Sequence, residues 1–185
     1  MFKKGLLQSQ IISMIQHLKL IDETKYRSIL DKIKQAFVNS KTVFVCGNGG
    51  SAANSNHLFC DFLKSIADNS KYKPKIFSLA TNIEFITAIS NDKSFKDIFS
   101  YQLDRFGSTK DLLIIFSVSG ASSNLIEVLK VAKKKKIFII SFLGKKNSPV
   151  YKLSNLSINV ESDDYGIVEN IHQFLMHSIC KDFMK

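Results

Sequence analysis

The chain has 185 residues, 45% of them hydrophobic and 23% charged, which is the size and composition of one soluble globular domain. Its apolar runs are far shorter than the ~20 residues of a membrane-spanning helix, so we expect no membrane partner. The formal net charge is +10. This charge can indicate nucleic-acid binding or the electrostatic steering of an anionic substrate. Because the lysines are scattered and no basic stripe is interleaved with aromatic residues, we interpret it as a solvated basic surface and expect no nucleic-acid partner.

Two helices are predicted before the first strand. Apolar residues recur at helical spacing from Leu6 to Leu18, and polar residues interrupt them, so this segment is interpreted as an amphipathic helix rather than a signal peptide. A second apolar series runs from Tyr26 to Phe37, in a helix that begins near Asp22.

The cysteines point to a reducing compartment. Cys46, Cys60 and Cys180 are an odd number and lack the CxxC spacing of a metal site. Reduced thiols in a cytoplasmic protein fit this pattern best.

Short apolar runs of the buried-strand type then alternate with helical segments. The predicted strands are Thr42–Cys46, Lys75–Leu79, Asp111–Phe116, Ile137–Leu143 and Leu156–Val160. The predicted helices cover 51–66, 81–90 with 94–105, 122–135 and 165–184. This alternation predicts an α/β fold over residues 41–185, a doubly wound parallel sheet with helices on both faces. Ligands of such sheets bind beyond the carboxyl ends of the strands.

Two loops of small residues follow predicted strands, Gly47 to Ser51 and Ser117 to Asn124. Each opens a helix, where backbone N–H groups and the helix dipole attract anions. Hydroxyls that can donate to a phosphate oxygen stand at Ser51, Ser117, Ser119 and Ser122. Either loop alone is equally explained by tight turns and helix caps, but both together at strand ends favour one phosphorylated ligand. Neither loop matches the dinucleotide or Walker A pattern.

Behind the glycine loop, His57 and Asp61 share a helix face, and Glu169, Gln173 and His177 share a face of the last helix. Glu169 and His177 are about 12 Å apart along an ideal helix, which two side chains and two metal bonds can bridge. Two histidines and two carboxylates suit a divalent ion such as zinc. Taken singly, His57 is better explained as a hydrogen-bonded histidine and the carboxylates as solvated charges. His172 is expected at the surface or at an interface.

Three stretches together resemble the sugar isomerase (SIS) domain, and more narrowly the phosphoheptose isomerases: CGNGGSAANSNH, TAISND (Thr87 to Asp92) and SVSGASSN. The likeness runs in one register from about residue 36 to Cys180. It implies a sheet of five parallel strands in a homo-oligomer, usually a tetramer, with active sites at subunit interfaces. The whole chain, 1–185, is then a single SIS domain whose N-terminal helical pair, 1–40, serves oligomerisation.

The resemblance also implies roles for residues. It assigns substrate binding to Asn48, Gly49, Gly50, Ser51, Asn91, Asp92, Gln102, Ser117, Ser119 and Ser122. It assigns proton transfer to Asp61 and His177, and one zinc ion per site to His57, Asp61, Glu169 and His177.

The chain departs from the family pattern in several places. Asp61 stands in place of Glu, Glu169 in place of Gln and Val118 in place of Thr, while Tyr165 and Ile167 replace Thr and Arg. The shorter Asp61 withdraws its carboxylate, and a misplacement of that order can cost about 10²-fold in rate unless something compensates. Glu169 adds negative charge that would hold a cation more firmly. These changes bear chiefly on which sugar is the substrate.

The sequence therefore predicts a phosphoheptose isomerase that interconverts sedoheptulose 7-phosphate and D-glycero-D-manno-heptose 7-phosphate for lipopolysaccharide precursors. The alternatives are a non-catalytic SIS module that binds a phosphosugar or a partner, and an isomerase of another phosphosugar. A scaffold has no need for His57, Asp61, Glu169 and His177 together, so this quartet favours an enzyme. A phosphosugar-sensing regulator usually carries an added DNA-binding domain, for which we expect no room in this chain.

Overall fold

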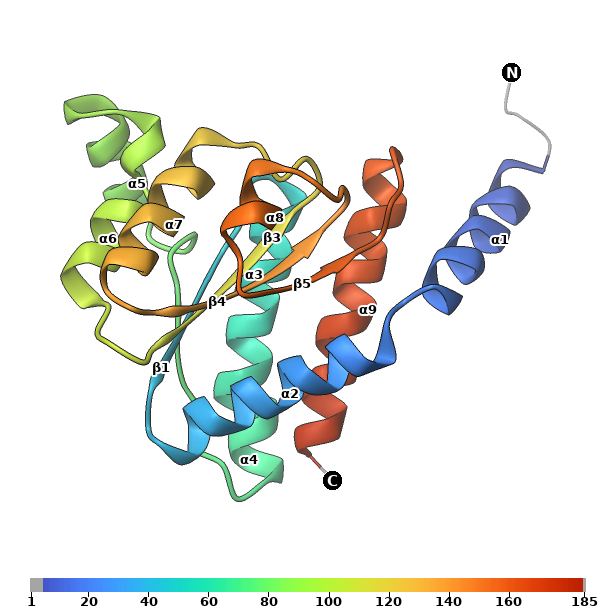
Figure 1. Ribbon diagram of the computed structural model, residues 1–185, viewed down its shortest axis with the longest axis horizontal. Helices are drawn as coiled ribbons and strands as arrows, with labels where there is room; N and C mark the ends of the chain where they lie inside the picture. Colours follow the sequence, from blue (N-terminus) through green and yellow to red (C-terminus); the bar gives the residue numbers. More distant parts are fainter. Residues whose placement is uncertain (1–4, 185) are drawn as a thin grey trace.

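The computed structural model describes residues 5–184, and within them the chain forms one parallel sheet in the order β2-β1-β3-β4-β5 (Figure 1). The strands are β1 Thr42–Cys46, β2 Lys75–Ser78, β3 Leu112–Ser117, β4 Phe138–Leu143 and β5 Leu156–Asn159. Every residue of the central β3 is buried, as expected for a parallel strand covered on both faces. The strand order reverses beside β1, which places the topological switch point between β1 and β3.

Helices cover both faces of the sheet. One face carries α2 Glu23–Val38, α3 Gly50–Cys60 with its continuations η1 Asp61–Ile66 and α4 Ala67–Asn69, and α9 Tyr165–Phe183. The other face carries α5 Ile83–Asp92, η2 Phe95–Asp97, α6 Ser100–Phe106, α7 Ser123–Lys134 and α8 Pro149–Leu153. Alternate residues of β1 enter the two cores, since Val43 and Val45 pack with α2, α3 and α9 while Phe44 and Cys46 pack with α5 to α8.

Local sequence signals account for the helix starts on the α9 side. The Asp22 carboxylate accepts a hydrogen bond from the Lys25 N–H at the start of α2, and that of Asp164 accepts one from the Ile167 N–H at the start of α9. These are N-cap contacts, each worth about 1 kcal/mol. At the C-terminal end of α7, Lys133 and Lys134 lie in the last turn, where cations complement the helix dipole.

The N-terminal helix α1, Leu6–Lys19, stands at the edge of the molecule (Figure 1). None of its residues is buried, and only its C-terminal part, through Met14 and Leu18, packs against the core. Its exposed apolar side chains are Leu6, Leu7, Ile11, Ile12 and Ile15. The chain alone therefore leaves much of the apolar face of α1 uncovered.

The predicted α/β fold class is confirmed, and every predicted strand is present with ends that differ by at most a residue or two. The predicted helix 51–66 continues to Asn69, and its middle part is a π-helix that begins at Asp61. No helix within residues 5–184 has the length and apolar character that a membrane crossing requires.

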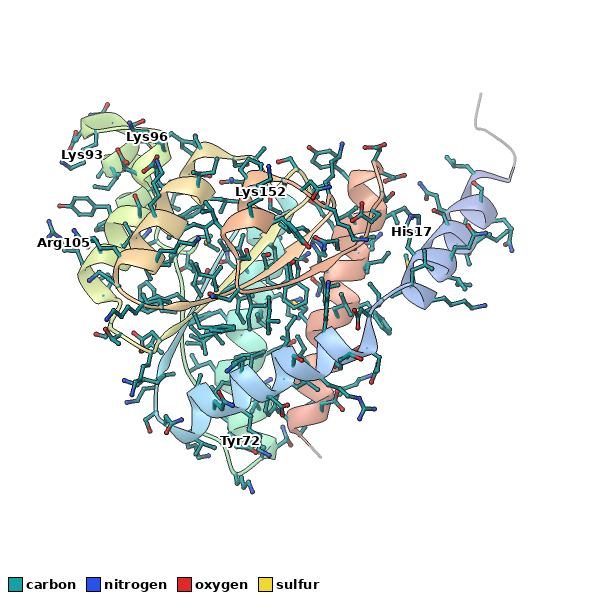
Figure 2. The ribbon with its side chains drawn as sticks, in the orientation of Figure 1. His17, Tyr72, Lys93, Lys96, Arg105 and Lys152 are labelled. Carbon is teal, nitrogen blue, oxygen red and sulfur yellow. The ribbon has the colours of Figure 1, made fainter. Side chains whose placement is uncertain are left out.

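Several of the positive charges project from different segments of the chain. Figure 2 shows the labelled Lys93, Lys96, Arg105 and Lys152 projecting from four separate segments, the end of α5, η2, α6 and α8. All three cysteines are free thiols.

Candidate active site

The two small-residue loops lie side by side, as predicted. They follow the hydrogen-bonded neighbours β1 and β3 and lead into α3 and α7, so two helix N-termini open at the switch point. Gly49 and Gly120 have φ angles of 56° and 62°, a left-handed region that favours glycine. We call residues 47–51 and 117–124 the anion cradle, because helix N-termini at this place attract anions.

Two serine hydroxyls are oriented by the turn that holds them. The Ser117 hydroxyl oxygen accepts a hydrogen bond from the Gly120 N–H at 3.0 Å, and that of Ser119 accepts one from the Ala121 N–H at 3.3 Å. Each hydroxyl therefore keeps its own proton for a ligand. Ser122 is the N-cap of α7 and makes no side-chain cap bond, while Ser51 is buried in the first turn of α3.

A pair of amides joins the two halves of the cradle. The Asn48 side-chain nitrogen donates to the Asn124 oxygen at 2.9 Å, and the Asn124 nitrogen donates to the Asn48 oxygen at 2.8 Å. Asn124 is 1% exposed. Because buried amides are stable only when paired, this contact sets the spacing of the two loops. Sequence reasoning included Asn48 but missed Asn124, which ends the serine loop.

Further along α3 a second cluster forms, and it also contains residues predicted for the site. The His57 Nε2 lies 3.7 Å from the Asp61 Oδ1, the His177 Nε2 lies 3.8 Å from the Asp61 Oδ2, and the two Nε2 atoms are 3.5 Å apart. Asp61 is the first residue of the π-helix, and π-helices are frequent at functional sites. His57 and His177 are about half exposed, so a ligand can reach them.

Gln173 completes this cluster, which we call the histidine group: His57, Asp61, Gln173 and His177. The Gln173 amide nitrogen lies 2.6 Å from the His57 Nδ1 and 3.2 Å from the His177 Nε2. Glu169 lies elsewhere, because its carboxylate is against Gly50 at the start of α3. The helical spacing of residues 169, 173 and 177 was recognised in the sequence, but only the packing of α9 on α3 distinguishes between Glu169 and Gln173.

The histidine group has the donors that zinc uses. One ligand atom from each of His57, Asp61 and His177 can be chosen so that all lie within 4.8 Å of one another. Imidazole nitrogens and a carboxylate oxygen are common zinc ligands, so the residues present fit such an ion. Next to Asp61, burial raises the pKa of the Cys180 thiol, and the negative charge of Asp61 adds to this, so Cys180 stays a neutral thiol.

Other predicted substrate contacts lie apart from the histidine group. Asn91 and Asp92 end α5, where the Asn91 amide donates to the Asp92 carboxylate at 2.9 Å, and both are exposed. Gln102 is 1% exposed, and its amide nitrogen donates to the carbonyls of Leu79 and Ile98. Gln102 therefore anchors α6 to the end of β2 in this chain.

His172 corrects one expectation. It was expected at the surface or an interface, but it is 0% exposed and packs against the stacked rings of Phe116 and Phe142. Among the described residues neither ring nitrogen has a hydrogen bond of normal geometry, although the Leu143 backbone lies close by. Burial lowers the pKa of His172 to about 4, so the ring is neutral near pH 7.

With this geometry established, the class of protein is clear. Residues 8–144 match the SIS domain family, so the chain belongs to that family.

Within it, the chain is similar to phosphoheptose isomerases, as its motifs predict. It is 35% identical over 182 residues to the phosphoheptose isomerase of Clostridium acetobutylicum, covering 96% of this chain and 92% of the relative. It is 31% identical over 180 residues to that of Campylobacter concisus, covering 96% and 93%. The solved phosphoheptose isomerase of Neisseria gonorrhoeae shares the fold, with a TM-score of 0.86, 24% identity, and coverage of 96% of this chain and 94% of that chain.

Proposed function

We propose that this chain is a phosphoheptose isomerase that interconverts sedoheptulose 7-phosphate and D-glycero-D-manno-heptose 7-phosphate, in the synthesis of lipopolysaccharide precursors in the cytoplasm. One observation carries the proposal: α3 begins in the anion cradle and carries His57 of the histidine group two turns further on. His57 follows Gly50 by about 10 Å along the helix axis. That distance is on the scale of a seven-carbon sugar phosphate, whose phosphate and reacting carbons must be held apart.

The reaction moves a proton between C1 and C2 through an enediol. Ser117, Ser119 and Ser122 hold the phosphate, with Asn48, Gly49, Gly50 and Ser51 beside them; Asn91, Asp92 and Gln102 remain predicted sugar contacts. Fixing the remote phosphate orients the reacting end, which can supply a large part of the rate enhancement.

Asp61 is the proposed base and His177 its partner at the other carbon or oxygen. Both are ordinary acid–base groups, and their side chains lie 3.8 Å apart. When bound, zinc would polarise the carbonyl and stabilise the charge of the enediolate. His57, Asp61 and His177 would hold it, with Glu169 as the predicted fourth ligand. A side chain committed to zinc cannot also be the free base. With zinc held through Asp61, the proton would be moved by His177 if that ring is not itself a ligand, and by a water if it is.

The proposal includes a homo-oligomer, a tetramer by resemblance, in which the helical pair of residues 1–40 makes subunit contacts. The exposed apolar side chains of α1 support this, because contiguous apolar patches on a soluble chain mark interaction sites.

The test is direct. Purified, metal-analysed protein is incubated with sedoheptulose 7-phosphate, and aldose phosphate is followed with and without added zinc. We expect turnover. Saturable binding of the sugar phosphate without turnover would contradict the proposal, and would favour another phosphosugar substrate or a binding module.

A further inference from the structure

A cleft of about 520 Å³ lies at the amino ends of the strands, at the end of the sheet opposite the anion cradle. It forms where α2 passes the starts of β1, β3 and β4, and its volume is in the range of pockets that bind small molecules. We call it the lysine cleft, because its charged lining residues are Lys32, Lys41, Lys110 and Lys136, with Asp111. None of these residues belongs to the cradle or to the histidine group.

The one acid of the lysine cleft is already paired with the backbone. The Asp111 carboxylate accepts hydrogen bonds from the Thr42 N–H at 3.0 Å and from the Ser108 N–H at 2.8 Å, and Asp111 is 4% exposed. Among the residues that the structure describes, the ion-paired lysines are all outside the cleft. Four lysines and one aspartate therefore leave the cleft with a formal charge of +3, which no neighbouring side chain neutralises.

Two of the four ammonium groups are held in place. The Lys32 Nζ donates to the Gln35 side-chain oxygen at 3.2 Å and lies 5.0 Å from the centre of the Phe138 ring. The Lys41 Nζ donates to the Thr109 carbonyl at 3.4 Å. Both lysines are partly buried. Because an ammonium group carries three N–H donors, each still has donors for a ligand.

The other two lysines stand on an unfavourable backbone. Lys110 and Lys136 have φ angles of 72° and 57°, in the left-handed region that a residue with a Cβ rarely adopts. The Lys110 N–H donates to the Lys136 carbonyl at 3.3 Å, which joins the turns before β3 and β4. Both side chains are exposed. Residues in such conformations gather at sites that clamp a ligand, which favours a function for these two side chains.

We propose that the lysine cleft binds an oligophosphate, an anion with several linked phosphate groups such as inorganic tripolyphosphate or a nucleoside triphosphate. Ammonium groups from α2 and from the starts of three strands surround one space, so a chain of phosphates can meet several of them at once. The unneutralised charge also attracts such an anion from a distance. Because β1 and β3 begin at this cleft and end at the cradle, the oligophosphate does not compete with the sugar phosphate.

The experiment measures binding rather than activity, so it is independent of the proposed function. The full chain is titrated calorimetrically with tripolyphosphate and with ATP, both free of magnesium, comparing wild type with Lys110→Gln/Lys136→Gln. We expect the double variant to bind about 10-fold more weakly, or about 3-fold for each exposed charge pair that is lost. Added salt should weaken the binding to wild type by screening. Equal affinities for the two ligands would assign recognition to the phosphate chain alone, and tighter binding of ATP would add a contact of its base with the Phe138 ring.

The matched control is Lys96→Gln/Lys152→Gln, which removes the same charge from two exposed lysines that lie away from α2 (Figure 2). We expect this control to bind as wild type does. Lys110→Gly/Lys136→Gly guards against misfolding, because glycine adopts a positive φ without strain. It should unfold in urea near the wild-type midpoint and still lose affinity. The inference is overturned if wild type binds neither ligand, if both glutamine variants lose affinity equally, or if the variants of Lys110 and Lys136 keep it.

Discussion

The anion cradle and the histidine group both include residues of α3, but they are built in different ways. The cradle is made of turns at the ends of two neighbouring strands, and its shape depends on main-chain angles such as those of Gly49 and Gly120. The histidine group is made of side chains from two helices that are 116 residues apart in sequence at the contact of His57 with Gln173.

This difference implies that binding and chemistry can be separated by mutation. Damage to the cradle should act mainly on affinity for the phosphate, because the phosphate is remote from the reacting carbons. Damage to the histidine group should act on the chemical step. The largest expected effect therefore belongs to the histidine group.

The substitution His177→Ala is the strongest test that binding and chemistry depend on separate regions. Loss of a positioned acid–base group costs about 10²–10⁴-fold in rate, so kcat should fall by that order. Binding of inorganic phosphate or of the sugar phosphate at Ser117 and Ser119 should survive, since those residues belong to the cradle. Steady-state kinetics and calorimetric titration measure the two quantities. Unchanged turnover would contradict the assignment of His177, and a loss of binding would contradict the separation of the two regions.

The core-facing side of α9 carries a buried histidine, His172, whereas its other histidine, His177, is partly exposed in the histidine group. The pH dependence of stability tests the buried environment of His172. Because its folded pKa is about 4, below the value of 6.5 for an unperturbed histidine, the unfolded state binds more protons between these pH values. His172 therefore destabilises the fold as the pH falls from 6.5 towards 4, by on the order of 3 kcal/mol in total.

The measurement is the free energy of unfolding in urea at pH 7 and pH 4.5 for wild type and His172→Leu. Other acid-sensitive groups are common to both proteins, so the drop in stability should be smaller in the variant. An equal drop in both would show that His172 is not the neutral, buried ring described here.

Within the cradle, two glycines should respond differently to alanine. A Cβ on Gly47 would lie 2.6 Å from the carbonyl oxygen of Ser51, so the backbone must shift, and we expect a cost of about 1–3 kcal/mol. A Cβ on Gly50 meets only the end of the Glu169 side chain, which can rotate away. Urea unfolding of Gly47→Ala and Gly50→Ala should therefore rank them in that order, and the reverse order would contradict the close packing at Gly47.

The smallest effect concerns the link between the two loops. Asn124→Leu removes both hydrogen bonds to Asn48 and should raise the KM for the sugar phosphate by about 10-fold with little change in kcat. The double variant Asn48→Leu/Asn124→Leu should cost no more than the single one, because the two amides act as a unit. Additive losses in the double variant would show that the amides act independently.

Much of the fold and of the cradle could be predicted because their signals are local. Buried strands are continuous apolar runs, glycines mark left-handed turns, and Asp22 caps its helix through a residue three positions away. The parallel order then brings the ends of β1 and β3 together. Asn124 was missed as a site residue because its pairing with Asn48 crosses from one loop to the other and has no local signal.

By itself the sequence determined the class of sheet, the two small-residue loops at the strand ends and the residue types of the histidine group, since short-range periodicity and spacing encode these. Only the tertiary structure decided which face of α9 meets α3. That packing turns Gln173 towards His57 and His177, leaves Glu169 against Gly50, and buries His172 against two stacked phenylalanine rings. The physical reason is that residues 169, 173 and 177 share one face of α9 and differ in position along its axis, so only the packing of α9 on α3 fixes which turn of α3 each one meets. His172 lies on another side of the same helix, which the packing turns into the core.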